Sequence, residues 1–239
     1  MKKIGVGHIE VILAFVLFIS SVVFMFYIFH PTQNRTFNEN SVVYLFDKIE
    51  QNISTDLLWY GVRTNITGDR IAINLNLSLD ELNLSVQDAE GNMFKNKIKG
   101  TGLGGGVVCI SNDSGSIPYF VYIYASPDIV DVQNTGNCPV STDETNYSLG
   151  AASKRKIISE NKIIKLNNTY YNQYSTLKKQ FGLRDGEDFE FEIVLSNSRR
   201  ISGNMNVPKD IEINSLNKRM EIIMTNGTIQ FADITIKTW

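Results

Sequence analysis

An uncharged run of nineteen residues, Val11 to Phe29, constrains this chain more than any other feature. As an α-helix the run would be roughly 28 Å long, close to the thickness of a bilayer's hydrocarbon core. It is longer than the apolar region of a removable secretory signal, and no small-residue cleavage site follows it. A lone carboxylate, Glu10, stands at its start, and a carboxylate near lipid favours a cationic partner over isolation. The run therefore predicts a transmembrane helix within residues 1–30.

The residues ahead of this run form a second pattern. Lys2 and Lys3 precede Gly5, and Glu10 is fifth in a count that begins at Val6. In this pattern the segment resembles type IV pilins and pilin-like proteins, whose basic leaders end in Gly and whose mature helices carry Glu at the fifth position. The resemblance implies cleavage between Gly5 and Val6 by a prepilin peptidase. It also implies that Glu10 pairs with the freed amine of a neighbouring copy during filament assembly. An uncleaved signal anchor, with Glu10 among the lipid headgroups, is the alternative.

The C-terminal third carries a weaker signature, formed by a helix end at 177–182, the start of a strand at 188–189 and the terminal stretch 236–239. In these segments the chain is similar to uncharacterised archaeal membrane-anchored proteins, which share the same kind of N-terminal segment. This similarity implies no activity.

Asparagine glycosylation sequons are more frequent than the composition explains. With 24 Asn and 34 Ser plus Thr in 239 residues, chance gives about three Asn-x-Ser/Thr sites, whereas the chain holds nine. A compositional bias toward these residues is the alternative explanation. Together with Lys2 and Lys3, the sequons predict a single-pass protein of the cell membrane, with its N-terminus cytoplasmic and its C-terminal domain extracellular. The candidate glycan acceptors are Asn34, Asn52, Asn65, Asn76, Asn83, Asn112, Asn146, Asn167 and Asn226.

Two cysteines fit an exported domain. A disulfide between Cys109 and Cys138 would stabilise the fold by about 3–4 kcal/mol in the chain-entropy model. Two buried free thiols are the alternative. Two Cys and two His without zinc spacing predict no metal site.

Hydrophobic periodicity predicts the elements after residue 30. Pro31 is expected to break or kink the first helix, and apolar residues at helix spacing predict an amphipathic helix within 31–56. A helix capped by Asn167 or Asn168 should end at Gly182, and a turn at 225–227 predicts a closing hairpin over 219–239. Alternation of apolar and polar residues predicts strands at 71–79, 82–86, 106–111, 117–125, 128–133, 154–159 and 189–195.

These elements predict an α+β fold, in which an N-terminal transmembrane helix precedes a mostly antiparallel, sandwich-like β ectodomain with one or two helices. The expected segments are a leader and transmembrane helix at 1–30, a membrane-proximal helix at 31–56 and an extracellular domain at 57–239. That domain is large enough for one core or for two subdomains, 57–150 and 151–239.

No motif predicts catalysis. The glycine-rich loop 102–106 precedes a strand and lacks a Lys-Ser/Thr pair, whereas a phosphate cradle needs a helix after its glycines. The only imidazoles, His8 and His30, flank the apolar run, which excludes a Ser-His-Asp arrangement in the ectodomain unless His30 folds back. Two acidic loops, 88–92 and 185–188, lack the spacing of a calcium motif. We therefore predict no enzyme, no metal and no cofactor.

Aromatic residues allow one binding hypothesis, a sugar platform, although core packing is the commoner fate at these spacings. Its candidates are Tyr119, Tyr122, Tyr124, Tyr170, Tyr171 and Tyr174.

The sequence as a whole favours a membrane-anchored structural protein of the cell surface, a pilin-like subunit or minor pilin that assembles through its N-terminal helix. Its expected partners are the lipid bilayer, copies of itself or other pilin-like subunits, and a prepilin peptidase. The net charge of −2 argues against nucleic acid. The alternative is an uncleaved single-pass surface protein whose β-domain binds a ligand or partner.

Overall fold

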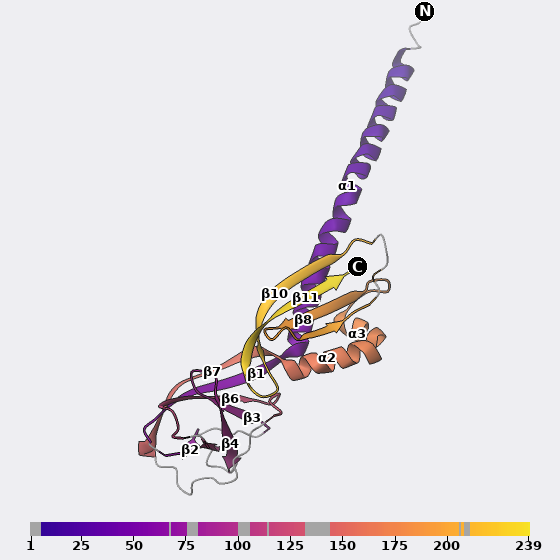
Figure 1. Cartoon of the computed structure of the whole chain (residues 1–239). Coiled ribbons are helices and arrows are strands. Elements are labelled where there is room, and N and C mark those ends of the chain that lie inside the picture. Colours follow the sequence, from indigo (N-terminus) through magenta and orange to yellow (C-terminus); the bar gives the residue numbers. More distant parts are fainter. Residues whose placement is uncertain are drawn as a thin grey trace, which may run out of the picture.

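The computed structural model describes residues 6–66, 68–75, 81–99, 106–113, 115–131, 144–205, 207 and 211–239, and for 6–9, 27–40, 99 and 144 it describes the backbone alone. The first element is a single helix, α1 (Val6–Ile53), which continues through Pro31 without the break expected there. Its second half lies on the folded part of the chain, and its first half extends away from it (Figure 1).

The predicted transmembrane helix is wrong for the described part of the chain, where no helix is both long and apolar enough to cross a membrane. The fold class predicted from the sequence, which included that helix, is corrected accordingly.

The remaining chain forms one mixed sheet of eleven strands with short helices, rather than the two separate sheets of the predicted sandwich. The strand order is β2-β5-β4-β3-β6-β1-β7-β10-β11-β8-β9. Among the described pairs, only β7 and β10 run parallel, through Ile158 beside Ile222 and Ser159 beside Ile223. The strands are β1 (Ser54–Thr64), β2 (Arg70–Asn74), β3 (Asn83–Gln87), β4 (Met93–Lys99), β5 (Val107–Ser111), β6 (Phe120–Ser126), β7 (Tyr147–Ser159), β8 (Phe189–Leu195), β9 (Arg200–Gly203), β10 (Asn214–Ile223) and β11 (Ile229–Thr238).

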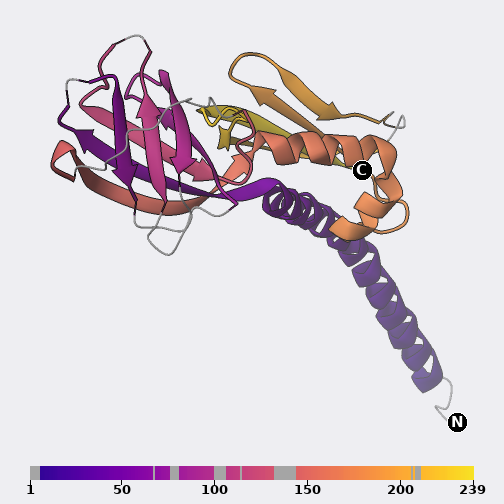
Figure 2. The ribbon, with the colours of Figure 1, turned by 90° about the horizontal axis from the view of Figure 1, so that it is seen from below.

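The sheet divides into two lobes, which are joined where the end of the long strand β7 pairs with β10 (Figure 2). The N-terminal lobe holds β1 to β6 and the first part of β7. In this lobe β4 changes partners, because Met93 and Phe94 pair with β3 whereas Lys95 to Lys99 pair with β5. The change folds β5 and β2 over the other strands around one apolar cluster, which includes Val62, Ile73, Val86, Ile110 and Ile123.

The C-terminal lobe is a sheet of β10, β11, β8 and β9 with α1, α2 (Glu160–Asn172) and α3 (Tyr174–Phe181) packed on it. A short 3-10 helix, η1 (Glu144–Asn146), precedes β7. The apolar stripe predicted within 31–56 is buried in this lobe, since Leu45, Phe46, Ile49 and Ile53 are at most 1 % exposed. They contact β-strand residues such as Ile234 in the largest core cluster. The second half of α1 is therefore the helix that fixes the first half to the fold.

A third, small cluster joins the lobes and contains Leu57, Ile129, Ile157 and Ile223. The turn between β10 and β11 strengthens this junction, because the Thr225 carbonyl accepts the backbone N–H groups of Val130 and Asp131 at 2.8 and 3.0 Å.

Several local predictions need correction. Residues 128–131 form a turn and an irregular segment rather than a strand, and 132–133 lie outside the described residues. The helix expected from Asn167 begins at Glu160, where the Ser159 hydroxyl accepts the backbone N–H of Lys162 at 3.2 Å. It ends at Asn172, and α3 then continues to the predicted stop at Gly182. The sequence pattern predicted no strand at the positions of β1, β4 and β9, and β1 begins at Ser54, within the range expected to be helical.

Candidate functional site

The first half of α1 presents an apolar surface to solvent. Between Glu10 and Phe26 every side chain except that of Val22 is exposed, and the exposed large apolar ones range from 44 % at Ile19 to 69 % at Val11. Phe15, Val16, Leu17 and Phe18 are consecutive, yet each is at least 56 % exposed. Since neighbouring residues of a helix point about 100° apart, these four residues cover all sides of it. An all-apolar helix of this kind is normally buried against other molecules.

The residues that the pilin resemblance singled out lie at or beyond the start of this surface. Gly5 lies outside the described residues, and Val6 is the first residue of α1 with its backbone alone described. Glu10 is exposed on the helix surface. The cleavage and the pairing of Glu10 with an amine stay predictions.

The predicted disulfide is described at one end only. Cys109 is completely buried in β5 and is not a free thiol. Cys138 lies outside the described residues, so the described part of the chain contains no complete disulfide and the pairing stays a prediction.

The nine sequons differ in accessibility. Asn76 and the side chain of Asn34 lie outside the described residues, whereas Asn52, Asn65 and Asn83 are exposed. Asn112, Asn146, Asn167 and Asn226 are half-buried. The Oδ1 of Asn167 is buried without a hydrogen-bond partner, and that of Asn226 accepts the Thr228 hydroxyl of its own sequon at 2.8 Å. Exposed acceptors are therefore Asn52, Asn65 and Asn83.

The tyrosines of the predicted sugar platform are divided between the lobes. Tyr119, Tyr122 and Tyr124 lie on or beside β6, whereas Tyr170 and Tyr174 pack on β8. Burial raises the pKa of Tyr170 and of Tyr174 well above the usual tyrosine range, and their hydroxyls bond to the Phe189 backbone. The six rings therefore do not form one platform.

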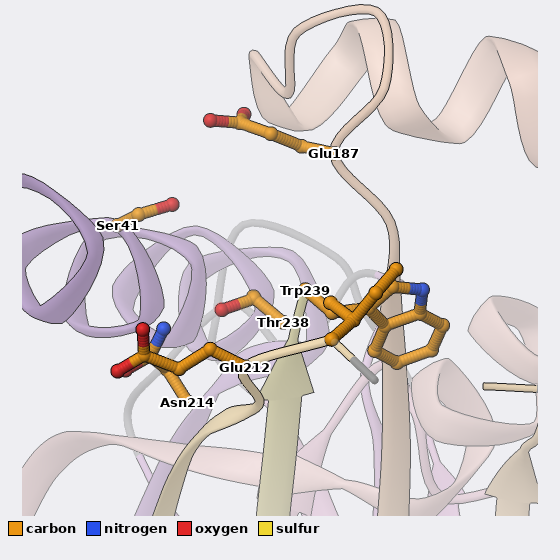
Figure 3. Close-up of a pocket in the computed structure, with 7 residues that line it drawn as sticks. Ser41, Glu187, Glu212, Asn214, Thr238 and Trp239 are labelled. Carbon is orange, nitrogen blue, oxygen red and sulfur yellow. The ribbon is translucent and has the colours of Figure 1, made fainter. Parts of the chain in front are cut away.

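A cavity of about 160 Å³ lies beside α1 where the helix leaves the C-terminal lobe (Figure 3). Four segments that are distant in the sequence form it: α1, the loop before β8, the start of β10 and the end of β11. Its lining residues are Ser41, Glu187, Ile211, Glu212, Asn214, Thr238 and Trp239. No sequence pattern predicts this cavity, because only the fold brings its lining residues together.

Polar groups in the cavity are available to a ligand. Thr238 is 5 % exposed, and its hydroxyl faces the cavity in Figure 3 without a hydrogen bond to any described residue. The carboxylate of Glu212 likewise has no ion pair within the described residues. Glu187 accepts the backbone N–H of Arg184 at 2.9 Å through one oxygen. The described lining therefore combines two carboxylates with hydroxyl and amide groups, and it includes no basic side chain.

Metal chemistry finds no support among the described residues, where no three His, Cys, Asp or Glu side chains gather at metal-binding distance. The side chains of His8 and His30 lie outside the described set.

Comparisons of the chain with protein-family models, with curated proteins and with solved structures returned no match.

Proposed function

We propose that this protein is a pilin-like structural subunit that assembles with copies of itself through the first half of α1. The observation that carries the proposal is the contrast within one helix. Val11 to Phe26 project with exposed apolar side chains, whereas Val42 to Ile53 anchor the helix in the core of the C-terminal lobe. The first half of α1 thus forms an apolar rod that no other part of the described fold covers.

Copies of the same helix are the binding partners that this geometry favours. A flat partner surface would bury one side of the rod, whereas the exposed side chains of Phe15 to Phe18 occupy all sides. Several rods bundled side by side bury all of them, at a gain of about 0.8 kcal/mol per CH₂ group removed from water. Both lobes lie at the far end of α1, where they leave the rod free to enter a bundle (Figure 1).

Glu10 has a place in such a bundle. A carboxylate surrounded by apolar helices is stable only beside a cation. The pilin resemblance supplies one, the Val6 amine of a neighbouring copy, once a prepilin peptidase has cut after Gly5. The sequons add a location to the proposal: glycans on exposed Asn52, Asn65 and Asn83 would place the lobes on the cell surface.

Sedimentation velocity and electron microscopy of the full chain without detergent test this proposal. We expect concentration-dependent oligomers or filaments, and we expect Phe18→Asp to return most of the protein to monomer, because burying an unpaired carboxylate costs several kcal/mol. Phe120→Asp is the matched control, since Phe120 is 53 % exposed on the N-terminal lobe and Phe18 is 65 % exposed. Glu10→Ala should also weaken assembly.

Two results would contradict the proposal. One is a wild-type chain that stays monomeric at every concentration or only floats with lipid vesicles. The other is a Phe18→Asp variant that assembles as well as Phe120→Asp.

A further inference from the structure

The cavity beside α1 lies outside the assembly surface and has chemistry of its own. Glu187 and Glu212 enter its lining from opposite sides, one from the loop before β8 and the other from the segment before β10 (Figure 3). Among the described residues that line the cavity, none is a Lys or Arg. Two carboxylates that line one partly enclosed space from opposite sides both contribute a negative potential there, which attracts a cation.

Hydrogen-bonding groups converge on the same space. Thr238 is a residue only 5 % exposed whose hydroxyl faces the cavity, and Ser41 and Asn214 add a second hydroxyl and an amide oxygen. A hydroxyl that faces a cavity without a protein partner is available to a polar ligand atom. An ammonium group donates three hydrogen bonds and suits an oxygen-lined pocket of this kind.

The rest of the lining is apolar and the space is small. Ile211 and Trp239 contribute apolar surface, and an indole ring also attracts cations. A cavity of about 150 Å³ in another protein accommodates a benzene molecule, so this one suits a ligand of about six heavy atoms. A linear alkylammonium, such as a lysine side chain, combines that size with a charged end and an apolar stem.

We propose that this cavity binds a primary alkylammonium group, with Glu212 as its main charge partner and Thr238, Ser41 and Asn214 as hydrogen-bond acceptors. The ammonium belongs either to a lysine side chain of another copy or to a free small amine. This site does not depend on assembly of the α1 rods.

Trp239 itself reports on binding. The chain has two tryptophans, so a Trp59→Phe background leaves Trp239 as the single emitter. We expect n-butylammonium to change its fluorescence with saturation in the millimolar range, as is reasonable for so small a ligand. Equal concentrations of 1-butanol and butyrate, which match the stem but lack the positive charge, should have no saturable effect. Glu212→Gln should weaken binding of n-butylammonium about tenfold.

The matched control is Glu90→Gln, an exposed carboxylate in a turn of the other lobe, which should leave binding unchanged. The proposal is overturned if n-butylammonium gives no saturable change, if 1-butanol binds equally well, or if Glu212→Gln binds as tightly as Glu90→Gln. Saturating n-butylammonium added to the sedimentation assay separates the two sources. Loss of large assemblies identifies a lysine of another copy, whereas unchanged assembly identifies a free amine. A chain that never assembles leaves the fluorescence test intact.

Discussion

At the scale of single residues, Gly227 couples the turn between β10 and β11 to the N-terminal lobe. Its backbone has a φ of +86°, and a Cβ built there would lie 2.2 Å from the Cβ of Ser85 on β3. The Gly227 carbonyl also accepts the side-chain amide of Gln87 at 2.8 Å. Only glycine permits this approach of two segments 140 residues apart.

We expect Gly227→Ala to lower the free energy of unfolding by about 2–4 kcal/mol, since overpacking adds to the cost of a left-handed backbone. Gly91→Ala is a closely matched control, because Gly91 has the same φ of +86° with no atom within 4 Å of the added Cβ. It should cost only about 1 kcal/mol. Urea unfolding of both variants measures the difference, and equal losses would show that the contact with Ser85 contributes nothing.

At the scale of elements, α2 and α3 hold β8 through two tyrosines, the buried Tyr170 and the half-buried Tyr174. The Tyr170 hydroxyl donates to the Phe189 carbonyl at 2.7 Å, and the Tyr174 hydroxyl accepts the Phe189 N–H at 3.1 Å and donates to Asp188. Burial raises the pKa of both hydroxyls, and the Asp188 carboxylate acts in the same direction. The folded state therefore keeps both protons at a pH where the unfolded chain loses them.

The consequence is a decline in stability at high pH. Below about pH 10 both states are protonated, so the tyrosines add no pH dependence. Above it, the unfolded state loses protons first, and each tyrosine lowers the free energy of unfolding by up to about 1.4 kcal/mol per pH unit. Urea unfolding between neutral and high pH should show this slope. Tyr170→Phe should reduce it, and Tyr171→Phe, at an exposed neighbouring position, should not. A wild-type chain equally stable on both sides of pH 10 would refute the prediction.

Periodicity predicted the elements whose pattern is local. Phe189 to Leu195 alternates strictly, and β8 has those bounds. Gly182 ends α3 with a φ of +74° as its position predicted, and the turn at Gly227 closes the expected hairpin. The sequence failed where tertiary contacts decide. Strand β4 carries polar residues at most positions and pairs with two different strands. The helix cap at Ser159 was not recognised, because this residue ends a segment with a strand pattern.

The candidate site also has one part that could be predicted from the sequence and one part that could not. The apolar segment after Glu10 is continuous in sequence and could be recognised directly, although its predicted passage through a membrane is not supported in the described residues. The cavity joins Ser41 to Glu187, Glu212 and Thr238, which no sequence spacing relates. A continuous sheet in place of a sandwich has the same origin, since the end of β7 pairs with β10 and so joins the strands of the two lobes.

At the scale of the whole molecule, the two lobes have separate large cores but a shared junction. Leu57, Ile129, Ile157 and Ile223 form that junction, and all four are at most 4 % exposed. Glu160 reinforces it: its carboxylate pairs with Arg199 and accepts the Thr225 backbone N–H. The first half of α1 is anchored in the C-terminal lobe, so a force on it would reach the N-terminal lobe only through this junction. The coupling would therefore matter for an assembled subunit.

Coupled lobes should unfold together. We expect one calorimetric transition for the wild-type chain. Leu57→Ala empties a fully buried position of the junction, so it should lower the free energy of unfolding by about 2–5 kcal/mol and split that transition in two. Leu149→Ala is the control, because Leu149 is 44 % exposed on β7 and its loss should leave a single transition. Two transitions already present in the wild type would mean that the junction does not couple the lobes. The first half of α1 would then be coupled only to the C-terminal lobe.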